Sequence, residues 1–271
     1  MANFFAWGAV FDLNREGNLK LVFFDVGQGD SAFIETPKGH QILIDGGPSP
    51  VVLEKLANEM PFWDRSIDLI ILSHPEEDHM AGLIEVLKRY KVKNILWTGV
   101  VRDTPEFKEW QRLIGLEGAG IKIAKAGQKI FLGNVLVEVL HPFEDWKGKK
   151  LKDSNFTSVA VRLVFGENSF LFPGDAYSFQ EKEMVLRQEV LDSDVLKAGH
   201  HGSKTSSSEE FLEKVSPSFV VISSGRDNSY GHPHPEVLAR FEKYGINVLR
   251  TDQEGDIKII SNGKNYGLPN F

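Results

Sequence analysis

Two histidines and three carboxylates that could hold a metal ion lie close together near the end of the first third of the chain. They are His74, Glu76, Glu77, Asp78 and His79. Neutral imidazole and ionised carboxylate are the ligands that Zn²⁺, Mn²⁺ and iron take, whereas Mg²⁺ and Ca²⁺ prefer oxygen alone. The chain has no cysteine, so any metal must be held by His, Asp and Glu. The alternative interpretation is a solvated acidic first turn of the following helix, which the helix dipole favours.

Three later segments repeat this placement at the ends of apolar strands. Asp45 follows such a run beside two glycines, Asp175 follows another beside Gly174, and His200 and His201 follow a third. A single Asp after a strand is more often a turn residue than a ligand. Because open α/β sheets bind ligands at the carboxyl ends of their strands, the recurrence predicts that these side chains meet in one site.

The elements that must position these residues follow from apolar spacing and turn residues. In the first half we expect strands at 19–25, 32–35, 41–45, 69–72 and 94–97, and helices at 51–60, 83–90 and 105–116, the last with Thr104 as its N-cap. Further strands follow at 121–124, 129–132, 136–140, 159–165, 170–172, 195–197 and 219–223, with a polar loop at 143–154. We expect helices at 179–189, 209–215 and 235–244, the last helix, and two short strands at the end. Both halves run strands first and then alternate strand and helix, which predicts one domain of two packed sheets with helices outside.

Composition and charge exclude some classes of protein. The 271 residues are 41% hydrophobic and 25% charged, as in soluble globular chains. The net charge of −7 argues against a protein that wraps DNA with a broad basic surface, but not against an enzyme whose bound cations supply positive charge. No run reaches the roughly 20 apolar residues that span a bilayer. The apolar extension at 1–18, with Phe4, Phe5 and Trp7, is either an edge strand or tail, or the trimmed end of a membrane segment.

The order of these motifs, from about Leu19 to Ile260, resembles the metallo-β-lactamase fold superfamily. Its signature is His-x-His-x-Asp-His on a strand-to-helix loop, followed by later His, Asp and His ligands. The resemblance implies an α+β fold, an αββα four-layer sandwich of two packed mixed β-sheets with helices on the outer faces, as a single domain over 1–271. Glu76 stands where the second His is expected, which argues against a true β-lactamase and favours a harder, Mn²⁺-tolerant site.

Three motifs narrow the resemblance to the C-terminal hydrolase domain of the competence DNA-uptake family ComEC and its free-standing relatives. They are residues 24–31, His200-His201-Gly202-Ser203 and residues 230–235. The family implies a metal-dependent nuclease acting on DNA, here expected to be single-stranded, and a membrane-channel partner or parent chain. It implies a cytoplasmic location for a free-standing chain and the extracellular face or periplasm for part of a competence membrane protein.

The superfamily pattern implies two divalent ions, Mn²⁺ or Zn²⁺. Carried over to this chain, His74 and Glu76 bind the first ion and Asp78 and His79 the second. Asp175 bridges them, and His201, or alternatively His200, completes the second site. Asp45 orients the loop through hydrogen bonds to the ligands. For the middle His of the pattern, His141 is one candidate, but we favour the segment 153–158 as a site-lining loop, with Asp153 or Asn155 near the metals.

Other residues are expected around the ions. The 25–31 segment is either a plain hairpin turn or a loop that brings Gln28 or Asp30 to a ligand His or a water. His232 and His234 either stiffen a helix entry or supply a general acid, since His titrates near neutrality. Asp78 or Asp175 orients the nucleophile, Ser203 belongs to the His200-His201 loop, and the basic residues beside the site loops are candidate phosphate contacts: Lys197, Lys204 and Arg226.

The function expected from this ligand set is a dinuclear phosphodiesterase or nuclease in which a water activated by the two ions attacks phosphorus. Two alternatives remain. One is a small-molecule hydrolase of the same fold, acting on a phosphodiester, lactone or thioester. The other is a degenerate metal-binding module of a membrane assembly, against which the nearly complete ligand set argues.

Overall fold

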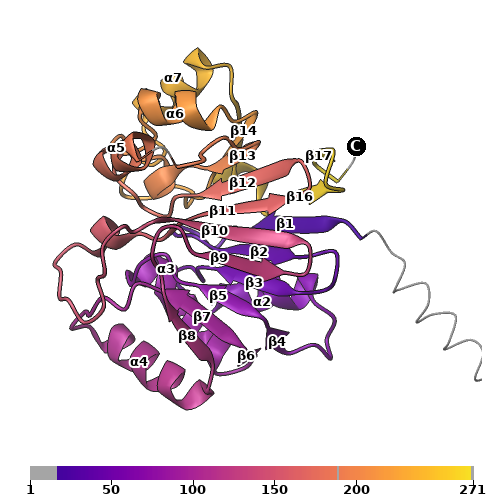
Figure 1. Ribbon diagram of the computed structural model, residues 1–271, viewed down its shortest axis with the longest axis vertical. Helices are drawn as coiled ribbons and strands as arrows, with labels where there is room; N and C mark the ends of the chain where they lie inside the picture. The colour runs from indigo at the N-terminus through magenta and orange to yellow at the C-terminus, as the bar shows by residue number, and fades with distance from the viewer. Residues whose placement is uncertain (1–16, 188, 270–271) are drawn as a thin grey trace, which may run out of the picture.

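The computed structural model describes residues 17–187 and 189–269, which form two packed β-sheets with helices on both outer faces (Figure 1). This arrangement confirms the predicted α+β fold of two mixed sheets in four layers. The apolar extension predicted at 1–18 falls almost entirely outside the described residues. Within the described ranges, no helix is both long enough and apolar enough to cross a membrane.

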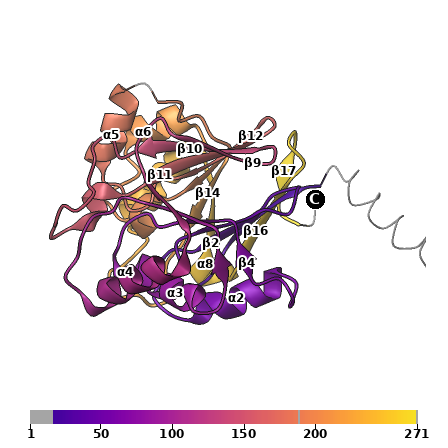
Figure 2. The ribbon, with the colours of Figure 1, turned by 60° about the horizontal axis from the view of Figure 1, so that its bottom comes forward.

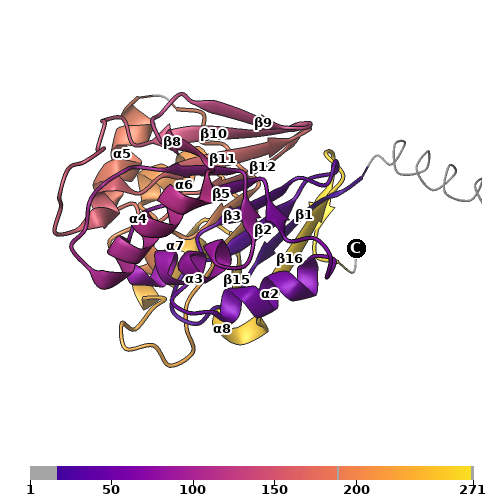
Figure 3. The same cartoon turned by 90° about the horizontal axis from the view of Figure 1, so that it is seen from below.

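The first sheet combines the start of the chain with its end. Its strands, in spatial order, are β17 (Tyr266–Gly267), β16 (Ile257–Ser261), β1 (Leu19–Phe23), β2 (Ala32–Glu35), β3 (Gln41–Ile44), β5 (Leu69–Ile71), β7 (Asn94–Trp97) and β8 (Gly120–Ile123). Strands β1 to β3 pair antiparallel, and β3, β5, β7 and β8 pair parallel. A small parallel pair, β4 (Ser66–Ile67) and β6 (Lys91–Val92), lies beside it. The helices α2 (Val51–Glu59), α3 (Glu77–Leu87) and α4 (Pro105–Glu117) cover its outer face (Figure 3).

The second sheet is built the same way, antiparallel first and parallel after. Its spatial order is β15 (Asn247–Arg250), β14 (Phe219–Ile222), β13 (Val195–Lys197), β12 (Asn168–Phe172), β11 (Ala160–Phe165), β10 (Val135–His141) and β9 (Lys129–Leu132). Its outer face carries α5 (Ser178–Leu186), α6 (Glu209–Val215) and α7 (Pro235–Lys243). Figure 2 shows α5 and α6 beside the sheet. Two 3₁₀ turns, η1 (Ser154–Thr157) and η2 (Gly199–Gly202), lie in its loops.

Side-chain alternation along the strands explains the layers. In β1, Leu21 and Phe23 belong to the core between the sheets, whereas Val22 belongs to the core beneath α2 to α4. Both faces of the strand are therefore buried, which explains why every residue of β1 except Lys20 is apolar. Phe23 stacks on Phe172 of β12 at 5.6 Å between ring centroids, which joins the two sheets.

Two predictions about the elements were wrong. The helix expected at 83–90 begins at Glu77, so Asp78 and His79 lie in its first turn and not in a loop. The spacing of Met80, Leu83 and Leu87 already extends the apolar stripe back to that turn.

The helix at 235–243 is also not the last, because α8 (Thr251–Glu254) follows β15. The chain then leaves the second sheet, and β16 pairs with β1 in the first one. The two sheets therefore do not correspond to two successive halves of the chain.

Candidate metal centre

The site forms where strands of both sheets end. Asp45 follows β3, His74 follows β5, Asp175 follows β12 and His200 follows β13. All four of these strands belong to the parallel parts of their sheets or border them. The carboxyl ends of strands from both sheets therefore meet at one edge of the sandwich, as expected for ligand sites in open α/β sheets.

Close backbone contact fixes the start of α3 against the loop after β3. Gly46 N donates to the carbonyl of His79 at 2.7 Å, and Gly82 N donates to the carbonyl of Gly47 at 2.9 Å. A Cβ at Gly82 would lie 1.9 Å from the carbonyl oxygen of Gly46. A side chain at this position would therefore push α3, and with it His79, away from Asp45.

Asp45 sets the orientation of two imidazoles. Its Oδ2 accepts from His79 Nδ1 at 2.9 Å and from the hydroxyl of Ser73 at 2.6 Å. The same hydroxyl oxygen lies 3.0 Å from His74 Nδ1, from which it can accept. Both rings thus use Nδ1 for these bonds and leave Nε2 as the free nitrogen, the arrangement in which a carboxylate orients a metal-binding histidine.

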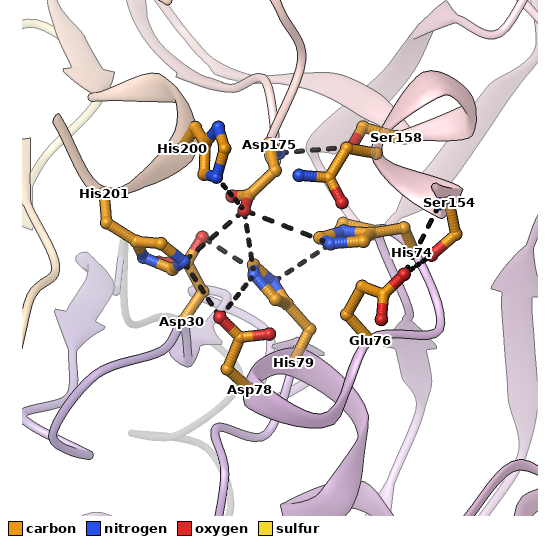
Figure 4. A network of polar contacts seen from close by, with 12 residues as sticks. Asp30, His74, Glu76, Asp78, His79, Ser154, Ser158, Asp175, His200 and His201 are labelled. Carbon is orange, nitrogen blue, oxygen red and sulfur yellow. Dashed lines mark hydrogen bonds and ion pairs between the residues drawn. The ribbon is translucent and has the colours of Figure 1, made fainter. Parts of the chain in front are cut away.

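The free nitrogens converge on one carboxylate oxygen, Asp175 Oδ2 (Figure 4). The Nε2 atoms of His79 and His201 lie 3.4 Å from it, that of His200 3.8 Å and that of His74 4.0 Å. His201 Nδ1 is used elsewhere, since it lies 3.0 Å from the Ser223 carbonyl. Asp175 itself is held by a bond from its backbone N–H to Ser158 Oγ at 3.2 Å.

The donor atoms of this cluster fit a divalent metal ion. Asp30, His79, Asp175 and His201 are all buried, and one ligand atom from each lies within 4.8 Å of the others. Among the described residues, Nε2 of His74, His79 and His201 and Oδ1 of Asp175 find no hydrogen-bond partner. Buried polar atoms are nearly always partnered, and a mixed set of imidazole nitrogens and carboxylate oxygens suits Zn²⁺, Mn²⁺ or iron.

Charge at the cluster is tightly balanced. Burial lowers the pKa of His79, but the carboxylates of Asp175, Asp78 and Asp45 outweigh it and raise the pKa well above its ordinary value. Burial acts on His201 in the same way, and Asp175 and Asp30 raise its pKa well above the ordinary value.

His74 behaves differently, because burial and the neighbouring charge of His79 lower its pKa to about 3. Without metal, two of the three imidazoles therefore hold protons that a metal ion would displace.

Lys197 and Asp30 form a buried ion pair that the sequence analysis did not foresee. The Lys197 ammonium contacts Asp30 Oδ2, and it lies 3.9 Å from Asp175 Oδ1. The prediction of Lys197 as a phosphate contact is therefore wrong, since its side chain is buried. The available signal was a lysine that ends an apolar strand, a position that places a charge among the ligands.

Glu76 does not join the cluster. Its Oε2 pairs with Arg102 at 2.9 Å, and its Oε1 accepts from the hydroxyl and backbone N–H of Ser154. Both oxygens of the predicted ligand to the first ion are thus engaged away from Asp175, although Glu76 lines the adjoining cavity. Its role as a metal ligand stays a prediction that the structure does not favour.

The 25–31 loop reaches the site as one of its two interpretations expected. Asp30 Oδ1 lies 3.1 Å from His201 Nδ1. Gln28 accepts from Gly225 N at 3.0 Å, and its Nε2 lies 3.5 Å from His232 Nδ1.

His232 lies over the histidine pair, with ring centroids 5.6 Å from His200 and 6.1 Å from His201. Burial and the charges of His201 and His200 lower its pKa to about 4. His234 is the N-cap residue of α7, and its ring centroid lies 4.9 Å from that of His232. Its Nδ1 accepts a hydrogen bond from Lys204 N. His232 therefore approaches the cluster, whereas His234 serves the helix entry.

The 153–158 segment borders the site and His141 does not. Asn155 lines the cavity beside His74 and Asp175. Asp153 instead caps η1 and accepts from the Tyr177 hydroxyl at 2.9 Å. His141 Nδ1 donates to the Ser158 carbonyl at 2.7 Å, so the ring holds the end of this segment in place.

The remaining predicted residues divide between cavity and surface. Asp78 Oδ2 lies 3.3 Å from His201 Nε2 and lines the cavity. Ser203 is buried, and its hydroxyl lies 3.0 Å from Thr205 Oγ1, which in turn lies 3.2 Å from His200 Nδ1. Lys204 and Arg226 are exposed, and their roles as phosphate contacts stay predictions.

A cavity of about 480 Å³ lies directly on the cluster. Its walls are His74, Glu76, Asp78, Asn155 and Asp175, with Gln28, Pro48, Glu77, His200 and Tyr230 around them. The size is that of pockets for small ligands.

The chain is similar in sequence to known proteins of one superfamily. The family model of the metallo-beta-lactamase superfamily matches residues 24–226. ComE operon protein 3 of Bacillus subtilis strain 168 is 30% identical over 263 residues, which cover 91% of this chain and 33% of that protein. Competence protein ComA of Neisseria gonorrhoeae is 33% identical over 244 residues, which cover 90% and 32%. The chain thus spans about a third of the length of these relatives.

A solved structure shares the fold. The metallo-beta-lactamase fold protein YhfI from Bacillus subtilis superposes with a TM-score of 0.60 at 14% identity, over 89% of this chain and 99% of that one. At this identity the likeness concerns the fold alone.

Proposed function

This chain belongs to the metallo-β-lactamase superfamily, and from that premise we propose that it is a metal-dependent phosphodiesterase that acts on DNA. Its proposed setting is competence-type DNA uptake, because its relative in Neisseria gonorrhoeae is named a competence protein and its relative in Bacillus subtilis a ComE operon protein. Metal-dependent hydrolysis is the general chemistry that family membership and the buried cluster support. That the substrate is a phosphodiester is the part of the proposal that goes beyond this general chemistry.

The observation that carries the proposal is the convergence of Nε2 of His74, His79 and His201 on Asp175 Oδ2. These residues would hold the metal, with His200 beside the same carboxylate and Asp78 beside His201 Nε2. Divalent ions in such a site polarise phosphoryl oxygens and lower the pKa of water.

The chain's own residues supply orientation and charge. Asp45 holds His79, and through Ser73 also His74, so that each presents Nε2. Asp78 and Asp175 border the cavity with unprotonated carboxylates, because the imidazoles around them outweigh the effect of burial and hold both pKa values below the ordinary value. Both can orient a water there by accepting a hydrogen bond from it. His232 lies half-buried beside the His200–His201 pair, with its ring centroid 5.6 Å from that of His200.

Hydrolysis by metal-stripped protein reloaded with Mn²⁺ or Zn²⁺ tests the proposal. The substrates are labelled single-stranded DNA and a small aryl phosphodiester, and the Asp175→Ala protein is assayed alongside. We expect metal-dependent cleavage of both substrates by the wild type and cleavage of neither by the variant. Cleavage of the small ester alone would replace DNA by a small-molecule substrate. Full metal occupancy without turnover on either would reject the phosphodiesterase.

A further inference from the structure

A continuous series of aromatic rings borders the metal cavity. In order these are Phe179, Phe156, Tyr177, His200, His232 and Tyr230, which we call the aromatic arc. Consecutive centroids are 5.5, 5.6, 5.4, 5.6 and 5.7 Å apart, within the range of ring contacts. The arc runs from η1 and the start of α5, over the histidine pair beside Asp175, to the loop before α7.

The two ends of the arc are exposed and its middle is not. Phe156, Phe179 and Tyr230 are 41%, 52% and 66% exposed, whereas His200 and His232 are partly covered. Single exposed apolar residues are ordinary, but here the exposed rings continue into the wall of the cavity. The exposed rings thus lie at both ends of a series that passes over His200 beside Asp175.

Local contacts hold these rings in place. The Tyr177 hydroxyl donates to Asp153 Oδ2 at 2.9 Å, so the ring stays between Phe156 and His200. Tyr230 lies nearly parallel to His232, with 21° between the ring planes. Rings fixed in this way lose little conformational entropy when a planar group stacks on them.

We infer that the exposed ends of the aromatic arc are stacking platforms for unpaired nucleobases, on either side of the phosphodiester that is cleaved. The inference rests on the proposed function and names what selects its substrate. Aromatic side chains bind single strands by stacking, without preference for one base, because every base presents a π-face. Bases inside a duplex already stack on their neighbours, so the platforms favour a single strand or a frayed end.

The charge of the site agrees with recognition through bases. The cavity walls carry Glu76, Glu77, Asp78 and Asp175, which repel a polyanion wherever metal does not compensate them. Lys204 and Arg226 are exposed, and Arg102 is paired with Glu76. The acidic walls do not attract the phosphates of a nucleic acid, so stacking of its bases must supply part of the binding free energy.

Binding to the metal-stripped 271-residue chain, measured by fluorescence anisotropy in EDTA, separates the contribution of bases from that of phosphates. The ligands are a twelve-nucleotide oligothymidylate, an abasic strand of the same length and a blunt two-stranded duplex. We expect the oligothymidylate to bind about 10-fold more tightly than the other two. The Phe156→Ala/Phe179→Ala protein should lose about 10-fold for the oligothymidylate and nothing for the abasic strand, and Tyr230→Ala should act in the same direction.

Two matched variants control for folding and for general exposure of rings. Phe156→Tyr/Phe179→Tyr keeps the rings and should bind like the wild type. Phe62→Ala/Trp63→Ala removes an exposed aromatic pair on the loop after α2, away from the cavity walls, and should also bind like the wild type. Equal binding of thymidylate and abasic strands, equal losses for both in the alanine variant, or no binding at all would overturn the inference.

Turnover keeps the inference separate from the proposed function. In the Mn²⁺-loaded wild type, absence of DNA cleavage with the binding pattern intact would reject the nuclease and leave the platforms. DNA cleavage with unchanged KM in Phe156→Ala/Phe179→Ala would reject the platforms and leave the nuclease. We expect KM for the single strand to rise about 10-fold, with turnover of a methyl aryl phosphodiester unchanged.

Discussion

Asp45 Oδ2 accepts a 2.9 Å hydrogen bond from His79 Nδ1 and, through the Ser73 hydroxyl, is also linked to His74 Nδ1. One carboxylate at the end of β3 therefore decides which nitrogen two imidazoles present to Asp175. Asp45 adopts a positive φ of 57°, a conformation that Asp tolerates better than most residues. This backbone conformation directs the Asp45 carboxylate toward Ser73 and His79.

We predict that Asp45→Asn weakens metal binding about 10- to 100-fold, the usual effect of removing such a partner. Both Asp45 oxygens accept, Oδ1 from Ser73 N and Oδ2 from His79 and the Ser73 hydroxyl. Asn has only one acceptor oxygen, so at least one of these bonds is lost in either orientation of the amide and the rings are held less firmly. Competition with a chromophoric chelator measures the loss. Asp68→Asn is the matched control, because Asp68 pairs with Lys93 at 2.6 Å, away from the cluster, and its affinity for metal should match the wild type.

Asp175→Ala should abolish turnover by several orders of magnitude without unfolding the protein. The change removes the oxygen on which the imidazoles converge, and a metal's charge stabilisation is worth several kcal/mol in rate. Circular dichroism and steady-state assays on one preparation check both parts. Correct folding with retained turnover would contradict the assignment of Asp175.

Metal binding should release about two protons near neutral pH, because His79 and His201 have raised pKa values in the metal-free protein. Neutral imidazole is the ligand form, so metal affinity should rise as pH rises through and above 6.5. His74, with its pKa lowered to about 3, contributes no proton. Calorimetry in buffers of different ionisation enthalpy counts the protons, and a pH-independent affinity would contradict the charge balance described above.

Lys197→Met should destabilise the protein by about 3–5 kcal/mol, the usual cost of leaving one charge of a buried pair alone. The Asp30→Asn/Lys197→Met double variant should recover much of that loss, because neither charge then remains. Urea unfolding measures all three proteins. Lys93→Met removes the exposed partner of Asp68, which keeps its hydrogen bond from Gln41 N, and should cost about 1 kcal/mol or less. Equal losses of unfolding free energy in Lys197→Met and Lys93→Met would contradict the larger cost expected for the buried pair of Lys197 with Asp30.

Gly82→Ala should destabilise α3 by about 1–3 kcal/mol through overpacking, since its Cβ would meet the Gly46 carbonyl. Gly115→Ala is the matched helical control, with no described atom within 4 Å of the new Cβ. It should be neutral or stabilise by up to about 1 kcal/mol through helix propensity. Thermal unfolding of the two variants compares them, and a stabilised Gly82→Ala protein would refute the close contact.

Local patterns predicted most of the fold and the centre of the site. Strand ends are legible from apolar runs that stop at Asp or His beside glycine, as at Asp45 and Asp175, and such ends share one edge of the sandwich. Thr104 illustrates the same point, because its side chain accepts from Phe107 N as the predicted N-cap.

What the patterns missed depends on contacts between distant segments. Glu76 is drawn to Arg102 and to Ser154, which lies 78 positions along the chain. The pairing of Lys197 with Asp30 joins β13 of the second sheet to the loop after β1 of the first. Neither partner is visible in local spacing, since sheet packing brings them together.

The most direct test of the metal centre is anomalous diffraction from crystals of the protein soaked in Mn²⁺ or Zn²⁺. The account predicts a peak about 2.0–2.2 Å from Nε2 of His79 or His201 and from an Asp175 oxygen, distances usual for such ligands. Peaks elsewhere on the chain, or no peak in crystals that diffract well at saturating metal, would contradict the assignment of this cluster as the metal centre.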